Sequence, residues 1–327
     1  MIPSRFILIT RRPRASTIRD AYASARLASF IMAEQGESYE EYEREERKLK
    51  EAAFRIKSVA AELGPVLEIE RNLLPSTPLG RHDVLIAIGQ DGLVANTLRY
   101  SADIPILGVN PDPDSYEGTL LPFDVESAIR YLKCRPSREH CEEITLAEGI
   151  FSNGAKIKAA NDIFIGKSDH SSSLYKIRHR EEMEHHSSSG IIVSTPMGAT
   201  GWQRSILEGS LRILSAVTGT PFRDIQEKEP TGKSENRLRF WVREPWQSLK
   251  SQSSLVSGTI TAGTPLLVTS EMGEGGTVFA DGMQADSFAF PAGESLQITP
   301  SATKGRLIVS YGEDDMRKDA VERSGHG

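Results

Sequence analysis

The sequence predicts an α/β N-terminal domain, in which helices flank a parallel sheet, followed by a β-rich C-terminal domain. Short apolar runs alternate with helical segments up to about residue 138, a pattern typical of parallel sheets. From Ile144 onward, short alternating segments separated by Gly, Pro, Ser and Asp indicate an antiparallel architecture. The length of 327 residues also fits two domains of roughly 150 residues each.

The first apolar run, 6–9, is expected to be a buried strand. A helix is predicted over 15–35, and a longer one over 38–63, where apolar residues recur every seven positions among Glu and Arg. Gly64 and Pro65 end that second helix. The stretch 66–69 then reads as a short strand.

The next elements follow the same alternation. A buried strand is predicted over 84–88, a helix over 93–100 and another strand over 104–109. The tetrapeptide Gly-Gln-Asp-Gly joins the first of these strands to the helix. This part of the chain, 1–138, is therefore expected to form the α/β domain.

The C-terminal domain, 139–305, is expected to consist of strands interrupted by one helix. The helix is expected to begin at Thr200 and to carry one apolar stripe, formed by Ile206, Leu207, Leu211 and Leu214. The segments 306–311 and 312–327 are expected to form a last strand and a frayed tail. The remaining short strands are predicted at 163–165, 255–260, 266–268, 278–279, 288–290 and 296–298.

Composition excludes several classes of protein. Charged residues make up 26% and the formal net charge is -6, which argues against a protein that grips nucleic-acid phosphates. No stretch approaches the roughly 18 apolar residues of a membrane helix. We therefore expect neither a nucleic-acid nor a membrane partner.

The cellular compartment is expected to be the cytoplasm. Cys134 and Cys141 are too few for a disulfide framework; they are either ordinary thiols or a redox pair. The arginines that precede Asp20 are similar to a mitochondrial leader. The strand expected at 6–9 argues against that alternative.

The strand–turn–helix segment at 89–92 is the first candidate for chemistry. Gly89 and Gly92 flank Gln90 and Asp91, and such a turn can present backbone N–H groups to a phosphate with help from the helix dipole. Asp91 could hold Mg²⁺ or accept a proton from an attacking hydroxyl. The alternative is a plain connection in which the glycines only supply positive φ.

Two further polar segments lie in the C-terminal domain. Asn161 and Asp162 precede the strand at 163–165; they could contact a ribose diol or simply form a turn. Asp281 and Gly282, between two strands, have the sequence of a type I′ hairpin turn.

The stretch 190–202 runs from a buried strand into hydroxyl and small residues. Ser194, Thr195 and Thr200 offer hydrogen bonds, and Trp202 offers a stacking face. In the alternative interpretation Thr200 is an N-cap and Trp202 packs in the core.

Taken in order, these segments resemble the NAD kinase family. That family carries a Gly-Gly-Asp-Gly loop, an Asn-Glu pair, a Ser-Thr-Pro-Thr-Gly-Ser/Thr-Thr-Ala-Tyr stretch and a late Asp-Gly. The resemblance is greatest to the branch that includes the animal mitochondrial NAD kinases, on the charged helix at 38–63 and on the matches at 108–113 and 161–166.

The resemblance implies a two-domain subunit, usually a homodimer, that transfers the γ-phosphoryl group of ATP or polyphosphate to the 2′-hydroxyl of NAD with Mg²⁺. The implied catalytic residue is Asp91, and the Mg²⁺ is held either through phosphates alone or through phosphates and Asp91. The implied phosphate-binding residues are Gly89, Gln90 and Gly92. The implied NAD-binding residues are Asn161, Asp162, Thr195, Thr200, Gly201 and Trp202.

This chain departs from the family pattern at several of these positions. Gln90 replaces the second Gly of the loop, and Asp162 replaces Glu. If position 90 needs a positive φ, its side chain costs about 1 kcal/mol. Two alternatives therefore stay open: a catalytically impaired relative that senses NAD or ATP, and a kinase of another acceptor such as a lipid.

Overall fold

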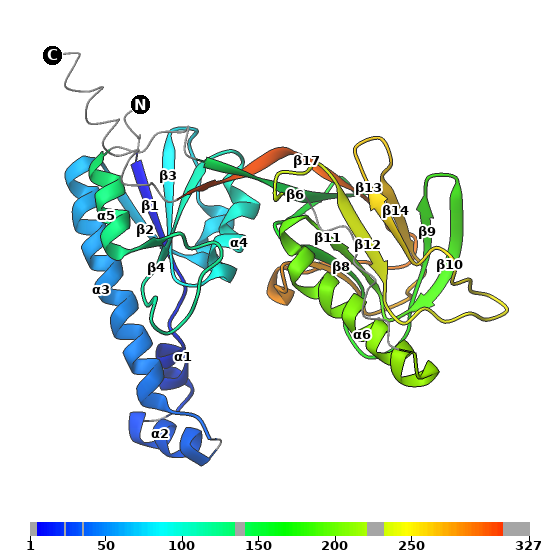
Figure 1. Ribbon diagram of the computed structural model, residues 1–327, viewed down its shortest axis with the longest axis horizontal. Coiled ribbons are helices and arrows are strands. Elements are labelled where there is room, and N and C mark those ends of the chain that lie inside the picture. Colours follow the sequence, from blue (N-terminus) through cyan, green and yellow to red (C-terminus); the bar gives the residue numbers. More distant parts are fainter. Residues whose placement is uncertain (1–4, 23, 35, 135–140, 221–231, 310–327) are drawn as a thin grey trace. The chain divides into compact units, whose positions relative to one another are not determined.

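A computed structural model describes residues 5–22, 24–34, 36–134, 141–220 and 232–309. The chain forms two compact units (Figure 1). Unit 1 comprises Met1–Glu142 and Arg306–Gly327, and unit 2 comprises Glu143–Gly305. The boundary expected at residue 138, the end of the strand expected at 306–311 and the tail expected at 312–327 lie outside the described residues.

Unit 1 is built on a parallel sheet, as predicted. Its strands are β1 (Arg5–Thr10), β2 (Val66–Glu70), β3 (Asp83–Ile88), β4 (Pro105–Asn110) and the short β5 (Phe123–Asp124). They follow the order β4–β3–β1–β2, with β5 beside β4, and all of these pairs are parallel. Apolar side chains are buried on both faces of the sheet, which explains why the strands read as continuous apolar runs.

Helices cover both faces of this sheet. The long α3 (Tyr39–Leu63) and α5 (Val125–Cys134) pack on one face, and α4 (Asp91–Ser101) lies on the other with the 3-10 helix η1 (Arg71–Ser76) (Figure 1). A doubly wound sheet of this kind places ligands at the carboxyl ends of its strands.

The prediction of a single helix over 15–35 is wrong. The segment forms α1 (Arg14–Ala21) and α2 (Ala25–Glu34), because Tyr22 adopts an extended conformation with φ of -119° and ends the first helix. The break lets both short helices pack on the start of α3, where Ala15, Ala28, Met32 and Tyr39 form a small separate core.

Unit 2 contains two sheets packed face to face. One follows the order β13–β12–β11–β8–β15–β16, with antiparallel neighbours. The other contains β10–β9–β14–β17, followed by β6 and β7. The bounds are β6 Cys141–Phe151, β7 Lys156–Ala159, β8 Asp162–Lys167, β9 Ser173–His179, β10 Glu182–Ser188, β11 Ile191–Ser194, β12 Leu238–Val242, β13 Ser257–Ile260, β14 Leu266–Ser270, β15 Gly276–Ala280, β16 Phe288–Ala289 and β17 Ser295–Ile308.

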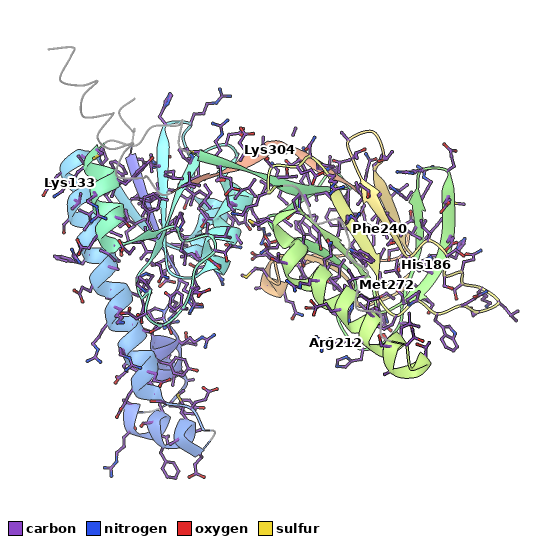
Figure 2. The ribbon with its side chains drawn as sticks, viewed as in Figure 1. Lys133, His186, Arg212, Phe240, Met272 and Lys304 are labelled. Carbon is purple, nitrogen blue, oxygen red and sulfur yellow. The ribbon has the colours of Figure 1, made fainter. Side chains whose placement is uncertain are left out.

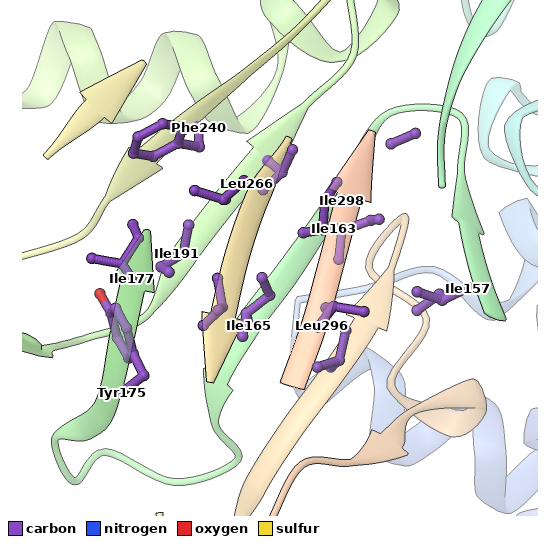
Figure 3. Close-up of a cluster of buried hydrophobic side chains, with 14 of the residues drawn as sticks. Ile157, Ile163, Ile165, Tyr175, Ile177, Ile191, Phe240, Leu266, Leu296 and Ile298 are labelled. Carbon is purple, nitrogen blue, oxygen red and sulfur yellow. The ribbon is translucent and has the colours of Figure 1, made fainter. Parts of the chain in front are cut away.

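The core of unit 2 lies between these sheets (Figure 3). Ile163, Ile165 and Ile191 point into it from one sheet, and Leu266 and Ile298 from the other. Phe240 and Met272 belong to the same core (Figure 2). The separate strands expected at 296–298 and from 306 are one continuous strand, β17, whose last residues pair with β4 of unit 1.

The helix of unit 2, α6 (Trp202–Thr218), starts two residues later than expected. Thr200 belongs instead to a 3-10 turn, η3 (Met197–Thr200), and Gly201 is the residue that precedes α6. The apolar stripe is partly covered: Ile206 packs against the cluster of Phe164, Ile192 and Phe279, whereas Leu214 is 43% exposed.

Candidate functional site

In unit 1 the candidate phosphate-binding turn connects β3 to α4. Gly89 has a φ of +156°, which L-residues rarely adopt and glycine tolerates. Gln90 has a φ of -112° and a ψ of 164°, which lie in the ordinary extended region. The strain considered for a side chain at position 90 is therefore absent.

Asp91 joins this turn to the loop that follows β4. Its Oδ1 accepts a hydrogen bond from the backbone N–H of Leu120 at 2.9 Å, and its Oδ2 accepts one from Thr119 at 3.1 Å. The hydroxyl of Tyr116 adds a second link by donating to the carbonyl of Gly89 at 3.2 Å. The carboxylate is thus held in one orientation at the first turn of α4.

Gly108 explains how closely this loop approaches the sheet. A Cβ atom on Gly108 would lie 2.2 Å from the carbonyl oxygen of Leu120, a distance no side chain tolerates. Glycine in the middle of β4 therefore allows the backbone at Leu120 to lie against the strand, next to Asp91.

Helix α3 contributes charged side chains to the same edge of the sheet. Glu45 accepts a hydrogen bond from Arg11, just after β1, at 2.9 Å. One turn later Lys48 pairs with the buried Asp112, whose pKa is lowered because hydrogen bonds from Lys48 and Ser115 outweigh its burial. The segment after β1 and the loop after β4, both at carboxyl ends of strands, are thus bound to α3.

Tyr116 lies in the middle of this charged group. Burial, together with the nearby carboxylates of Glu45 and Asp112, raises the pKa of its hydroxyl to about 12. Tyr116 therefore keeps its proton at neutral pH and serves as a hydrogen-bond donor. Neither its sequence context nor that of Glu45 marked these residues as part of the site, because the contacts join segments distant in the sequence.

In unit 2 the structure brings Asn161, Asp162, Thr195 and Asp281 together. The Asp281 carboxylate accepts hydrogen bonds from the backbone N–H groups of Ala160, Asn161 and Asp162 at 3.0, 2.7 and 3.2 Å. The N–H of Thr195 donates to the carbonyl of Asn161 at 2.8 Å. Polar segments that are far apart in the sequence therefore form one polar cluster at the ends of β8, β11 and β15.

The turn expected at Asp281 and Gly282 is present. Both residues have positive φ, 53° and 71°, and the N–H of Met283 donates to the carbonyl of Ala280 at 2.9 Å, as in a type I′ turn. The connection to β16 is longer than a two-residue hairpin, because the 3-10 helix η4 (Gln284–Asp286) follows the turn. The sequence indicated the turn but not the role of its carboxylate.

Gly198 allows the closest approach in this region. A Cβ atom there would lie 2.2 Å from the carbonyl oxygen of Asn161. The small residues of the 195–201 turn therefore let two backbone segments touch. Thr200 and Gly201, on the outer part of the turn, are exposed.

Asp162 is the most strongly perturbed carboxyl group of the site. It is 8% exposed, and burial, assisted by the negative charge of Asp281, raises its pKa to about 7. Ser194 lies opposite Asp162 on the neighbouring strand. Its hydroxyl is buried and has no hydrogen-bond partner in the described part of the chain. Two polar groups on one face of the sheet thus have unused hydrogen-bonding capacity.

Trp202 packs against other side chains, as the alternative interpretation of this residue expected. Its ring stacks on Phe164 with a centroid distance of 5.8 Å and an interplanar angle of 5°. The guanidinium of Arg243 lies 5.6 Å from the centroid of the same ring, within the range of a cation–π interaction. Trp202 remains half-buried, so part of its surface stays accessible.

The described residues contain no group of three or more His, Cys, Asp or Glu side chains that could hold a metal ion. A Mg²⁺ ion brought in by a nucleotide binds through substrate phosphates and only one or two carboxylates. Asp91 fits that role: each of its oxygens accepts one hydrogen bond and keeps a second lone pair. In the same residues, no helix is both long enough and apolar enough to cross a membrane.

Comparison with solved structures identifies the architecture. The chain aligns with an NAD kinase from Archaeoglobus fulgidus solved in complex with ATP, with a TM-score of 0.53 and 15% identity, covering 99% of this chain and 100% of the other. It aligns with yeast NADH kinase solved in complex with NADH, with a TM-score of 0.56 and 15% identity, covering 99% and 89%. The chain has the NAD kinase fold.

Sequence comparison also finds similarity to NAD kinases. NAD kinases from the Corby, Paris and Philadelphia 1 strains of Legionella pneumophila are 27% identical to this chain over 146 residues, which are 42% of this chain and 49% of each relative. The matched region thus spans about half the length of these NAD kinases. No family model matches the chain.

Proposed function

We propose that the protein is an NAD kinase-like phosphotransferase, which moves the γ-phosphoryl group of ATP to the 2′-hydroxyl of the adenosine ribose of NAD. The observation that carries this proposal is the geometry of Asp91. A carboxylate fixed by the N–H groups of Thr119 and Leu120 stands at the first turn of a helix that begins at the carboxyl end of a parallel strand.

The proposed chemistry uses Asp91 as the general base. The ribose 2′-oxygen attacks the γ-phosphorus, the bond from that phosphorus to the oxygen it shares with the β-phosphorus breaks, and Asp91 takes the hydroxyl proton. Gly89, Gln90 and Gly92 form the turn whose backbone N–H groups would bind phosphate. Mg²⁺, when bound with ATP, would neutralise charge on the transferred group.

We assign the acceptor nucleotide to the polar cluster of unit 2. Asn161, Asp162 and Thr195 lie together there, and the buried hydroxyl of Ser194 has no hydrogen-bond partner among the described residues. At pH values near 7 the Asp162 carboxyl group can donate as well as accept a hydrogen bond, which suits a ribose hydroxyl. Thr200, Gly201 and Trp202 would line the outer part of this site.

The test is the formation of NADP. Purified protein is incubated with Mg-ATP and NAD, and NADP is read with an NADP-specific dehydrogenase. We expect steady formation, reduced by at least about a hundredfold in Asp91→Asn, because the amide cannot act as a base. Retained NAD binding in that variant would separate lost chemistry from lost binding. No NADP from the unaltered protein would overturn the proposal.

One support of the impaired-relative alternative was strain at Gln90, and the extended φ of that residue removes this support. A lipid kinase is distinguished by replacing NAD with diacylglycerol and measuring the ADP that is formed from ATP. From the family resemblance we also infer a homodimer, and we propose the cytoplasm as the compartment. Light scattering after size-exclusion chromatography tests the first, and microscopy of a tagged protein tests the second.

A further inference from the structure

The Gln90 side chain is directed toward helix α3. Its Nε2 donates to Oε1 of Glu45 at 3.4 Å, and the same oxygen accepts the 2.9 Å hydrogen bond from Arg11. Three elements therefore meet at one oxygen atom: the end of β1, the turn after β3 and the middle of α3. A glycine at position 90 could not form this contact, because it has no side chain.

The surroundings of this contact restrict how Glu45 can move. The Arg11 and Glu45 side chains are only 24% and 30% exposed, so their ion pair is partly shielded from water. Lys48, one turn further along α3, holds Asp112 in the neighbouring loop. Glu45 is thus a fixed acceptor on a helix that already holds the other loop of the site.

Asp91 follows Gln90 directly, so the position of one residue constrains the other. The backbone of Gln90 also accepts the hydrogen bond from the N–H of Leu93 at 2.8 Å, which closes the first turn of α4. Any change in the orientation of residue 90 therefore reaches the Asp91 carboxylate and the first N–H groups of the helix.

We propose that Gln90 is a positioning residue, which fixes the 89–92 turn and Asp91 by binding Glu45 on α3. The inference rests on the proposed function, because it assigns Gln90 a role in that same site. In this chain the contact of the Gln90 side chain holds the turn, whereas a second glycine at this position would have left the turn conformationally free. The glutamine variant of the loop is then a rigid, competent form.

The test is a set of exchanges at the two positions, followed by NADP kinetics. We expect Gln90→Gly to lower kcat by about tenfold, because small displacements of a reacting group are costly, and to leave KM for NAD unchanged. Gln90→Glu would place two carboxylates together and lower kcat as well. The double exchange Gln90→Glu with Glu45→Gln restores an amide–carboxylate pair and is expected to recover most of the lost rate.

Glu41→Gln is the matched control, because Glu41 lies on the same helix, one turn earlier, with a side chain that is 70% exposed. We expect it to retain the full rate. The inference is overturned if Gln90→Gly is as active as the unaltered protein or more active. It is also overturned if the double exchange is no better than Gln90→Glu alone.

Calorimetric titration with Mg-ATP separates this inference from the proposed function. If the unaltered protein forms no NADP but binds ATP, and Gln90→Gly weakens that binding, the proposed acceptor is wrong and the positioning role stands. If Gln90→Gly changes neither the ATP affinity nor the rate, the positioning role is wrong whatever the acceptor.

Discussion

The carboxylate of Asp281 accepts a 2.7 Å hydrogen bond from the backbone N–H of Asn161, a residue 120 positions earlier in the sequence. The contact means that the Asp-Gly turn is also the support of the Asn-Asp pair. An ordinary hairpin turn needs only the backbone conformation at its central residues. Here the side chain of the turn residue holds the start of β8.

We expect Asp281→Asn to destabilise unit 2. Replacing one carboxylate oxygen by an NH₂ group leaves at least one of the N–H groups of residues 160–162 without an acceptor, at a cost of about 1–3 kcal/mol. Chemical denaturation monitored by tryptophan fluorescence measures the loss. Asp114→Asn is the control, because Asp114 is exposed in unit 1. Equal stability of the two variants would show that the Asp281 contacts contribute little.

The pKa of Asp162 predicts a pH dependence of stability. Burial raises it from 3.8 to about 7, so the folded protein binds this proton more tightly than the unfolded chain. The contribution of this proton to the free energy of unfolding is complete below pH 4. It is lost as pH rises through 7, by at most about 1.4 kcal/mol per pH unit.

Asp162→Asn tests this sign directly, because asparagine imitates the protonated carboxyl group. We expect the free energy of unfolding of the variant to fall less between pH 5 and pH 8 than that of the unaltered protein, and the variant to be the more stable of the two at pH 8. Parallel pH profiles would contradict the assignment.

Two glycines of unit 2 provide a matched pair for packing. At Gly198 an added Cβ would meet the carbonyl oxygen of Asn161 at 2.2 Å, so Gly198→Ala must displace backbone and should cost about 1–3 kcal/mol. At Gly209, within α6, no atom lies within 4 Å of an added Cβ. Gly209→Ala should therefore raise stability by about 1 kcal/mol through helix propensity. Thermal unfolding of both variants decides, and a stable Gly198→Ala protein would show that the turn can move.

A substitution at Gly92 tests whether a phosphate of ATP binds close to the 89–92 turn. An added Cβ would meet no protein atom within 4 Å, and the position lies in the first turn of α4. We expect Gly92→Ala to fold with unchanged or slightly higher stability and to raise KM for ATP at least about tenfold, because the methyl group occupies space that a phosphate needs. An unchanged KM for ATP would place the phosphate elsewhere.

The sequence predicted the buried strands well, because the runs 6–9, 84–88 and 104–109 are apolar on both faces. The break between α1 and α2 could not be predicted: it depends on Tyr22 adopting an extended conformation so that both helices reach Tyr39. The start of α6 was missed for a similar reason, since Thr200 is drawn into a 3-10 turn beside Asn161. In each case tertiary contacts overrode a local preference.

The candidate residues of the site were identified from their neighbours in the sequence, but their partners were not. Asp91 is held by Thr119 and Leu120, and Gln90 by Glu45. These contacts join loops from different strands, and no periodicity or spacing encodes them. The extended conformation of Gln90 likewise depends on the path of the backbone after β3. The presence of glutamine in place of glycine in the sequence does not reveal that path.

The path of β17 has a consequence for how the protein is made. Unit 1 is assembled from both ends of the described chain, because Arg306 and Leu307 pair with Pro105 and Ile106 of β4. During synthesis the first 142 residues leave the ribosome with that edge of their sheet still open. An exposed strand edge is a template for association with other chains. Nascent protein therefore carries an aggregation hazard until residue 307 has been translated, and a fragment truncated after residue 142 would retain it permanently.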